Sequence, residues 1–312
     1  MSFISEIFGY LLNWLYNFFN NYGIAIIIFS FILRIILIPI TIKQQKSMKK
    51  SAVLQAQMTE IQKKYKNNPE KLNQETIELY RREKMSPFSG CLTAILQLLI
   101  ILSVFWLVSQ PLTYMKKVDS GIIENYTNEM RESGYAQNNN YVQIAVIDYA
   151  ENKYGEIDQQ LVNETDETKK VELEAKRDEY DQLRLNMNFL GIDLSKVPTQ
   201  NLQDWRVYVI PVLYVITSLI STKLTTLSQK KKKKLSNEEG KEEELEPMEQ
   251  MQQMNNNMMY MIPVMSVMIA IVAPLGLALY WLISNVFMII ERIVINIIME
   301  KNEESKEEAE NG

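Results

Sequence analysis

A single charged residue, Arg34, interrupts the apolar run 24–42. As a helix rising about 1.5 Å per residue, the run would be about 28 Å long, enough to cross the hydrocarbon core of a bilayer. Arg34 would then lie near the midplane, where a guanidinium costs roughly 2.5–3.5 kcal/mol on insertion scales. We therefore expect a functional Arg34 that faces water inside the protein. The alternatives are structural: Arg34 reaches the interface, or it pairs with an acid, for which Glu291 is the nearest candidate.

Five apolar runs divide the chain, and each can cross a bilayer as a helix. The pattern predicts an all-α polytopic membrane protein with five transmembrane helices, at residues 24–42, 91–112, 205–224, 258–273 and 275–298. Apolar runs that alternate with strongly charged stretches are not typical of a single soluble domain. The fourth run is short, so it would need a locally thinned bilayer or lateral support.

The segments on either side of the first run have amphipathic patterns. Residues 1–23 carry an apolar stripe, which predicts an interfacial amphipathic helix lying on the membrane; an extended first span is the alternative. The stripe consists of Ile4, Ile7, Phe8, Leu11, Leu15 and Phe18. Residues 43–86 carry one stripe from Leu54 to Tyr65 and another from Leu72 to Leu79, with a break at 67–69. They predict a cytoplasmic helical hairpin, with a solvated linker as the alternative.

Charge sets the expected orientation. Residues 43–86 hold 11 Lys or Arg and 5 Asp or Glu, a net charge of +6, whereas 113–204 hold 10 and 18, a net charge of −8. The positive-inside rule places 43–86 in the cytoplasm and 113–204, an acidic helical insert, outside. Within the charged loop 225–257, Lys230–Lys234 would lie against anionic lipids. With the acidic tail 299–312 also inside, we expect a bacterial plasma-membrane protein with its N-terminus outside and its C-terminus in the cytoplasm.

The residue types present disfavour catalytic chemistry. The chain has no histidine and one cysteine, Cys91, so the usual general base, the Ser-His and Cys-His nucleophile pairs and most zinc sites are absent. It also lacks a GxGxxG, P-loop or CxxC motif. We therefore expect no enzyme, no cofactor, no metal site and no direct binding of nucleic acid.

Three polar residues lie within the predicted spans: Arg34, Gln97 and Asn285. Trp281 precedes Asn285 by one helical turn. If these side chains face a common interior, they form a hydrophilic pocket inside the membrane. Such a pocket would not be a cation pore, because it contains a cation and neutral amides rather than an acidic ring.

Several stretches resemble the YidC/Oxa/Alb family of membrane protein insertases, in its Gram-positive YidC form. They are Phe31–Thr41, Glu78–Lys84, Pro87–Leu92 followed by Gln97, Phe189–Ser195 and Pro274–Asn285. Each stretch alone is a weak signal, but the ordered set covers the predicted hairpin and the predicted spans. Departures include Thr93 and Leu98, where many members have proline, and Glu291, where glutamine is common.

The resemblance implies a five-helix core with a hydrophilic groove open to the cytoplasm and to lipid. In it, Arg34 would attract the acidic N-terminal segment of a small nascent membrane protein, whose apolar helix then enters lipid. Gln97 would line the groove, and Trp281 and Asn285 would bind substrate or be structural. The hairpin would receive substrates and partners: the Sec translocon, the ribosome or signal recognition factors. Two further hypotheses stay open: a small transporter with Arg34 as its anion site, and a membrane scaffold.

Overall fold

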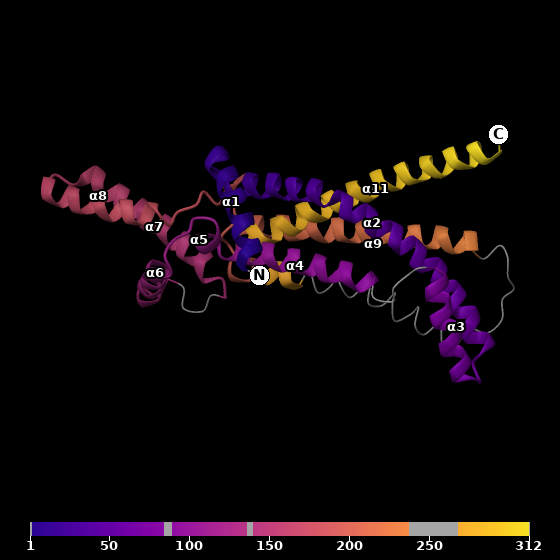
Figure 1. Ribbon diagram of the computed structural model, residues 1–312. Helices are drawn as coiled ribbons and strands as arrows, with labels where there is room; N and C mark the ends of the chain where they lie inside the picture. Colours follow the sequence, from indigo (N-terminus) through magenta and orange to yellow (C-terminus); the bar gives the residue numbers. More distant parts are fainter. Residues whose placement is uncertain (1, 84–88, 136–139, 237–267, 312) are drawn as a thin grey trace.

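The computed structural model describes residues 2–83, 89–135, 140–236 and 268–311, and within them the chain is mostly helical (Figure 1). The α-helices are α1 (Ser2–Phe19), α2 (Tyr22–Lys64), α3 (Pro69–Arg82), α4 (Ser89–Ser109), α5 (Pro111–Tyr114), α6 (Ser120–Glu132), α7 (Val142–Asn163), α8 (Glu167–Asp181), α9 (Val209–Ser236) and α11 (Leu275–Asn311). The shorter elements are β1 (Asn188–Phe189), β2 (Ile192–Asp193), η1 (Pro198–Gln200) and η2 (Trp205–Tyr208).

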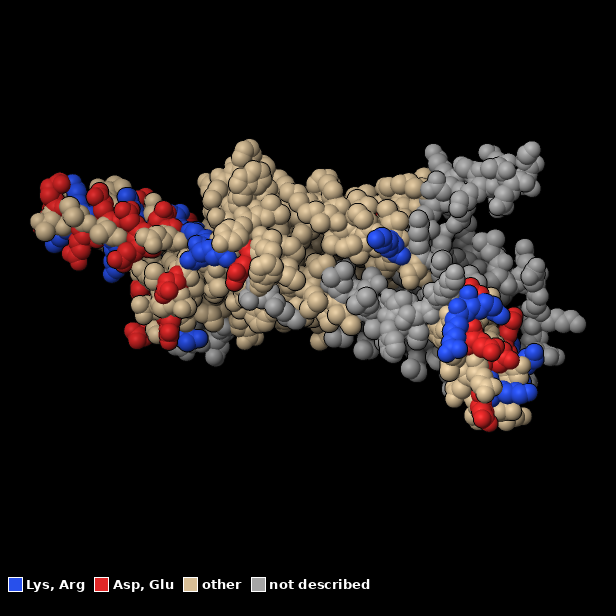
Figure 2. All heavy atoms as spheres, viewed as in Figure 1, with Lys and Arg blue, Asp and Glu red and all other residues tan. Residues whose placement is uncertain are grey.

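Three helical stretches in the described residues are long and apolar enough to cross a membrane. They are Tyr22–Gln44, Trp205–Leu224 and Leu275–Ile295, and a shorter apolar stretch, Leu98–Ser109, lies in α4. Figure 2 shows a broad belt with few charged side chains between two charged ends of the molecule. The expectation of a mostly helical chain with long apolar helices is confirmed. The acidic insert is not purely helical, because β1 and β2 pair within it as an antiparallel hairpin.

The long helices form one bundle in which α11 packs against α2 and α9, and α1 packs against α2 and α4. The insert, with α6, α7 and α8, lies at one end of this bundle (Figure 1). The hairpin of α2 and α3 lies at the opposite end, where α9 and α11 also have their C-terminal ends. The two charged segments are thus separated by the length of the bundle.

Helices continue past the boundaries that hydropathy predicts for the spans. α2 is unbroken from Tyr22 to Lys64 and contains Pro39, so the first run and the first arm of the hairpin are one helix. α9 likewise continues to Ser236, and α11 continues to Asn311. Hydropathy marks where a helix leaves an apolar environment, whereas backbone hydrogen bonds decide where it ends.

Local sequence explains the turn of the hairpin. The Asn68 side chain accepts a hydrogen bond from the Lys71 amide at 3.1 Å, and Pro69 takes the first helical position of α3. Both are favoured choices for a helix start. Leu54 of α2 and Leu79 of α3 are buried, in keeping with the stripes read from the sequence.

Some sequence predictions fall on residues outside this description. Most of the fourth run, 258–273, is outside it, and only 268–273 are described. Lys230–Lys234 lie on the last turns of α9, but their side chains are not described, and the same holds for Gln97 on α4.

Residues 186–196, here called the clamp segment, hold the starts of two long helices together. The Asn186 carbonyl accepts from the Tyr22 amide at 3.0 Å, where α2 begins. The carbonyls of Leu194 and Lys196 each accept at 2.9 Å, from the Gly276 and Leu275 amides at the start of α11. The first amides of a helix have no partner within it, so the clamp segment satisfies groups that are costly to leave unpaired in an apolar setting.

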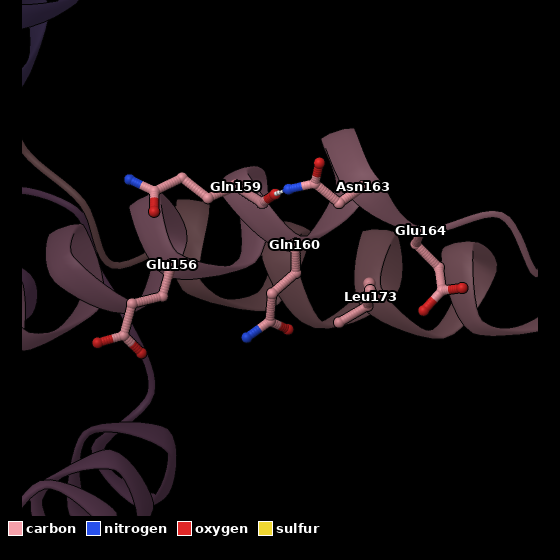
Figure 3. A pocket seen from close by; sticks show the side chains of 6 residues that line it. All are labelled: Glu156, Gln159, Gln160, Asn163, Glu164 and Leu173. Carbon is pink, nitrogen blue, oxygen red and sulfur yellow. Dashed lines mark hydrogen bonds between the residues drawn. The ribbon is translucent and has the colours of Figure 1, made fainter.

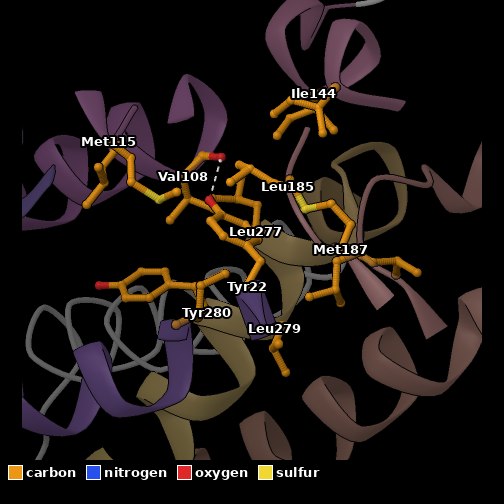
Figure 4. Close-up of a cluster of buried hydrophobic side chains, with 14 of the residues drawn as sticks. Tyr22, Val108, Met115, Ile144, Leu185, Met187, Leu277, Leu279 and Tyr280 are labelled. Atoms are coloured by element: carbon orange, nitrogen blue, oxygen red, sulfur yellow. Dashed lines mark hydrogen bonds between the residues drawn. The ribbon is translucent and has the colours of Figure 1, made fainter. Parts of the chain in front are cut away.

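A buried cluster joins the clamp segment to the bundle (Figure 4). Tyr22 is fully buried, and its hydroxyl donates to the Val108 carbonyl of α4 at 3.4 Å. Leu185 and Met187 flank the first clamp carbonyl, and Leu277 comes from the start of α11. Apolar burial and helix-end hydrogen bonds therefore converge at the same place.

The acidic insert contributes side chains of α6, α7 and α8 to the same buried cluster as the bundle. The Glu129 carboxylate of α6 accepts from the Tyr149 hydroxyl at 3.0 Å and from the Tyr180 hydroxyl. Tyr149 and Tyr180 are buried. Burial, together with the Glu179 carboxylate, raises the pKa of the neighbouring Tyr126 to about 12. The helices of the insert thus pack around tyrosines whose hydroxyl groups donate to Glu129.

We predict that Gly9→Ala destabilises the bundle. A Cβ on Gly9 of α1 would overlap the carbonyl oxygen of Tyr114 in α5, so the two helices would have to move apart. The cost of such overpacking is about 1–3 kcal/mol. Thermal unfolding in detergent, followed by tryptophan fluorescence, should show a lower midpoint.

The matched control for Gly9 is Gly155→Ala. A Cβ on Gly155 of α7 meets no atom within 4 Å, so the change should stabilise α7 slightly through helix propensity. Equal midpoints for the two variants would contradict the close approach of α1 and α5.

Candidate functional site

Arg34 lies between α2 and α11, about 18 Å along α2 from Tyr22 at about 1.5 Å per residue. Its Nη2 donates to the Ser284 carbonyl at 3.2 Å, and its Nη1 lies 3.5 Å from Oε2 of Glu291. Both partners belong to α11. The Arg34 side chain keeps 20% of its surface exposed, so it is paired and also accessible.

Glu291 is the more deeply buried member of the pair, with 8% of its side chain exposed. Its Oε1 is buried and has no hydrogen-bond partner among the residues that the structure describes. The sequence favoured a water-facing Arg34 and kept pairing with Glu291 as the alternative. The structure shows the pairing, because α11 brings Glu291 beside Arg34, and it leaves part of the Arg34 side chain exposed.

Asn285 and Trp281 contact a different neighbour from Arg34. Asn285 is buried, and its Nδ2 lies 3.3 Å from the Thr217 hydroxyl of α9. The Trp281 ring centroid lies 6.5 Å from that of Tyr214, also on α9, with the ring planes tilted by 39°. These two residues therefore join α11 to α9, whereas Ser284 and Glu291 join α11 to α2.

Hydroxyl groups on α9 are the part of this site that sequence reasoning missed. Thr217, Ser218, Ser221 and Thr222 recur at helical spacing, and the last three are buried. Thr217 holds Asn285, and the Thr222 hydroxyl donates to the Ser218 carbonyl at 2.9 Å. Their helical spacing within the third apolar run indicates one polar face, and this pattern could have been recognised in the sequence. The Ser284 carbonyl, being backbone, gave no such signal.

The arrangement can hold an anion but offers little to a metal. Across the described ranges, no group of three or more Asp, Glu, Cys or His side chains gathers as a metal site would require. A guanidinium with part of its surface open can bind a carboxylate through two parallel hydrogen bonds. A pocket elsewhere, on the α7 and α8 hairpin of the insert, is lined mainly by polar and acidic side chains (Figure 3). It contains no cation to bind an acidic ligand.

We predict that Arg34→Ala destabilises the protein more than Arg34→Ala combined with Glu291→Gln. The single change leaves a buried carboxylate without its partner, at a cost of up to about 3 kcal/mol, and the double change removes that charge. Thermal or denaturant unfolding of the purified protein measures the difference.

The Arg177 and Asp158 pair of the insert is the control for this cycle, because it has the same 3.5 Å separation but is more exposed. Its Arg177→Ala change should cost less than about 1 kcal/mol, with little recovery on adding Asp158→Asn. A similarly small, additive loss of stability at Arg34 would mean that Arg34 does not stabilise the buried Glu291 carboxylate.

Similar sequences among known proteins identify the family of this chain. Residues 14–303 match the family described as 60Kd inner membrane protein. Three similar proteins, each named membrane protein insertase YidC, come from Caldanaerobacter subterraneus (42% identity over 105 residues, 34% of this chain and 51% of the relative), Fusobacterium nucleatum (41% over 102 residues, 33% and 50%) and Syntrophobacter fumaroxidans (38% over 104 residues, 33% and 19%). The matched part thus spans about half, or less, of each relative. Because the family match covers nearly the whole sequence, the chain belongs to the 60Kd inner membrane protein family, that of the YidC and Oxa proteins.

Proposed function

We propose that this protein is a membrane protein insertase of a bacterial plasma membrane, of the Gram-positive YidC type, that transfers small membrane proteins into lipid. The observation that carries the proposal is Arg34: a partly exposed guanidinium between α2 and α11, on the apolar stretch Tyr22–Gln44. Family membership and the names of the relatives support it. The function needs neither a cofactor nor a metal, because it is a transfer between environments and not a chemical reaction.

The proposed topology has five spans, with the N-terminus outside and the C-terminus in the cytoplasm. α4 is the second span, and the run 258–273 is the fourth. The net charges of +6 on 43–86 and −8 on 113–204 support this orientation, since these segments lie at opposite ends of the bundle. The exposed aromatic residues Trp14 and Trp205 fit an interface with lipid headgroups.

The proposed mechanism uses a polar path at half depth. Arg34 attracts the acidic N-terminal segment of a substrate, and a fixed positive charge lowers the electrostatic cost of bringing that segment into the membrane. A short fourth span would thin the bilayer beside it and shorten the path. Gln97 on α4 would add a further amide, and the α9 hydroxyls with Asn285 add polar groups along α11.

The substrate's apolar helix then leaves the protein sideways. Outward-facing apolar side chains on α9 and α11 offer it a surface that is continuous with lipid; they include Val212, Ile216, Leu219, Ile220, Ile290, Val294 and Ile297. Removing apolar area from water, at roughly 25 cal/mol per Å², supplies the driving force. Trp281, whose ring lies beside that of Tyr214 on α9, would bind the substrate or hold α11 against α9.

The proposed partners lie at the cytoplasmic end. The hairpin of α2 and α3 projects away from the bundle there, with Arg81 and Arg82 in the last turn of α3. It would receive nascent membrane proteins and contact the Sec translocon, the ribosome or signal recognition factors. Lys230–Lys234 would bind anionic lipids at the same end.

We predict that purified protein in liposomes inserts a small single-span protein with an acidic N-terminal tail, and that Arg34→Ala reduces insertion about tenfold, equivalent to about 1.4 kcal/mol. Arg34→Lys should retain much of the activity, because it keeps the positive charge. Protease protection of the tail measures insertion.

The control is Arg177→Ala, which removes an arginine of the insert and should not change insertion. Equal insertion by wild type and Arg34→Ala would remove Arg34 from the mechanism. A folded wild-type protein that inserts nothing would favour the transporter or scaffold hypotheses.

A further inference from the structure

The Arg34 and Glu291 pair is unequal in accessibility. Glu291 has 8% of its side chain exposed and Arg34 has 20%. Of the two side chains, Arg34 is therefore the more accessible to an approaching anion. The pair contributes no net charge, so in the resting protein the attraction of Arg34 for a substrate is already partly cancelled by a carboxylate on the same chain.

The hydrogen bonding between Arg34 and Glu291 is also weak and incomplete. The 3.5 Å separation of Nη1 and Oε2 exceeds the roughly 2.7–2.9 Å of a strong charge-assisted hydrogen bond. The contact is single and not bidentate, because Nη2 is directed to the Ser284 carbonyl. Within the described part of the chain, Oε1 of Glu291 has no partner. A better-placed carboxylate can therefore compete with Glu291 for Arg34.

Glu291 would not become an isolated charge if Arg34 turned to another carboxylate. Arg292 follows it directly in α11, so a second positive charge is adjacent to Glu291 in the sequence. An uncompensated buried charge is costly, so a second cation beside Glu291 makes the exchange of partners feasible.

We propose that Glu291 is an internal competitor for Arg34 that an acidic substrate segment must displace, and that it thereby sets how much negative charge a substrate needs for insertion. This inference rests on the proposed function. Substrate tails with several acidic residues displace Glu291, whereas tails with one acidic residue compete poorly. Glu291 is therefore a specificity-determining residue, and Arg34 is the group that binds.

The test uses the full-length protein in liposomes and one single-span substrate whose N-terminal tail carries zero, one or three acidic residues. Glu291→Gln is nearly isosteric and removes the competing charge. It should raise insertion of the one-acid substrate roughly fivefold, which corresponds to about 1 kcal/mol. Insertion of the zero-acid and three-acid substrates should stay nearly unchanged. Glu291→Asp keeps the charge one methylene further from Arg34 and should fall between wild type and Glu291→Gln.

The control is Glu124→Gln, which removes an exposed carboxylate on α6 of the insert and should match wild type on all three tails. Equal changes on all three tails in Glu291→Gln would show a general loosening of the bundle and overturn the proposal, as would no change on any tail. If Glu291→Gln does not fold, a Glu291→Asp variant with wild-type tail dependence overturns it. Absence of wild-type insertion is a separate result, which rejects the proposed function and this inference with it.

Discussion

The structure depends on how the backbone groups at the starts of α2 and α11 are satisfied. An apolar bundle offers no water to the first amides of a helix, and each unpaired amide there costs several kcal/mol. The clamp segment supplies carbonyls from Asn186, Leu194 and Lys196 to both helices. It thereby fixes the two helix starts side by side. The contacts between α2 and α11 deeper in the bundle depend on that placement.

The Arg34 and Glu291 pair is one consequence of that placement. Each residue alone would be expensive at membrane depth, and together they form a pair that is buried but imperfect. A perfect bidentate pair would stabilise the fold and hide Arg34 from any ligand. The observed geometry leaves the guanidinium partly open, as the binding role that we propose for Arg34 requires.

Sequence reasoning singled out residues that are unusual in their own local context. A charge in an apolar run drew attention to Arg34, and amides in similar runs drew attention to Gln97 and Asn285. It could not find the Thr217 partner of Asn285, because that contact joins residues far apart in the chain. It marked Phe189–Ser195 only as a stretch that resembles the family, and it missed the hydrogen bonds of the clamp segment, whose carbonyls belong to the backbone and leave no signature in residue type.

The sequence by itself determined the apolar helices, the charged segments between them, the hairpin turn at Asn68 and Pro69, and the presence of a costly arginine. These features follow from hydropathy, charge and local turn chemistry, which act over a few residues. Only the tertiary structure decided that α11 presents Ser284 and Glu291 to α2, and Trp281 and Asn285 to α9. The rotation of a helix about its own axis is set by packing against its neighbours, and no single apolar run contains that information.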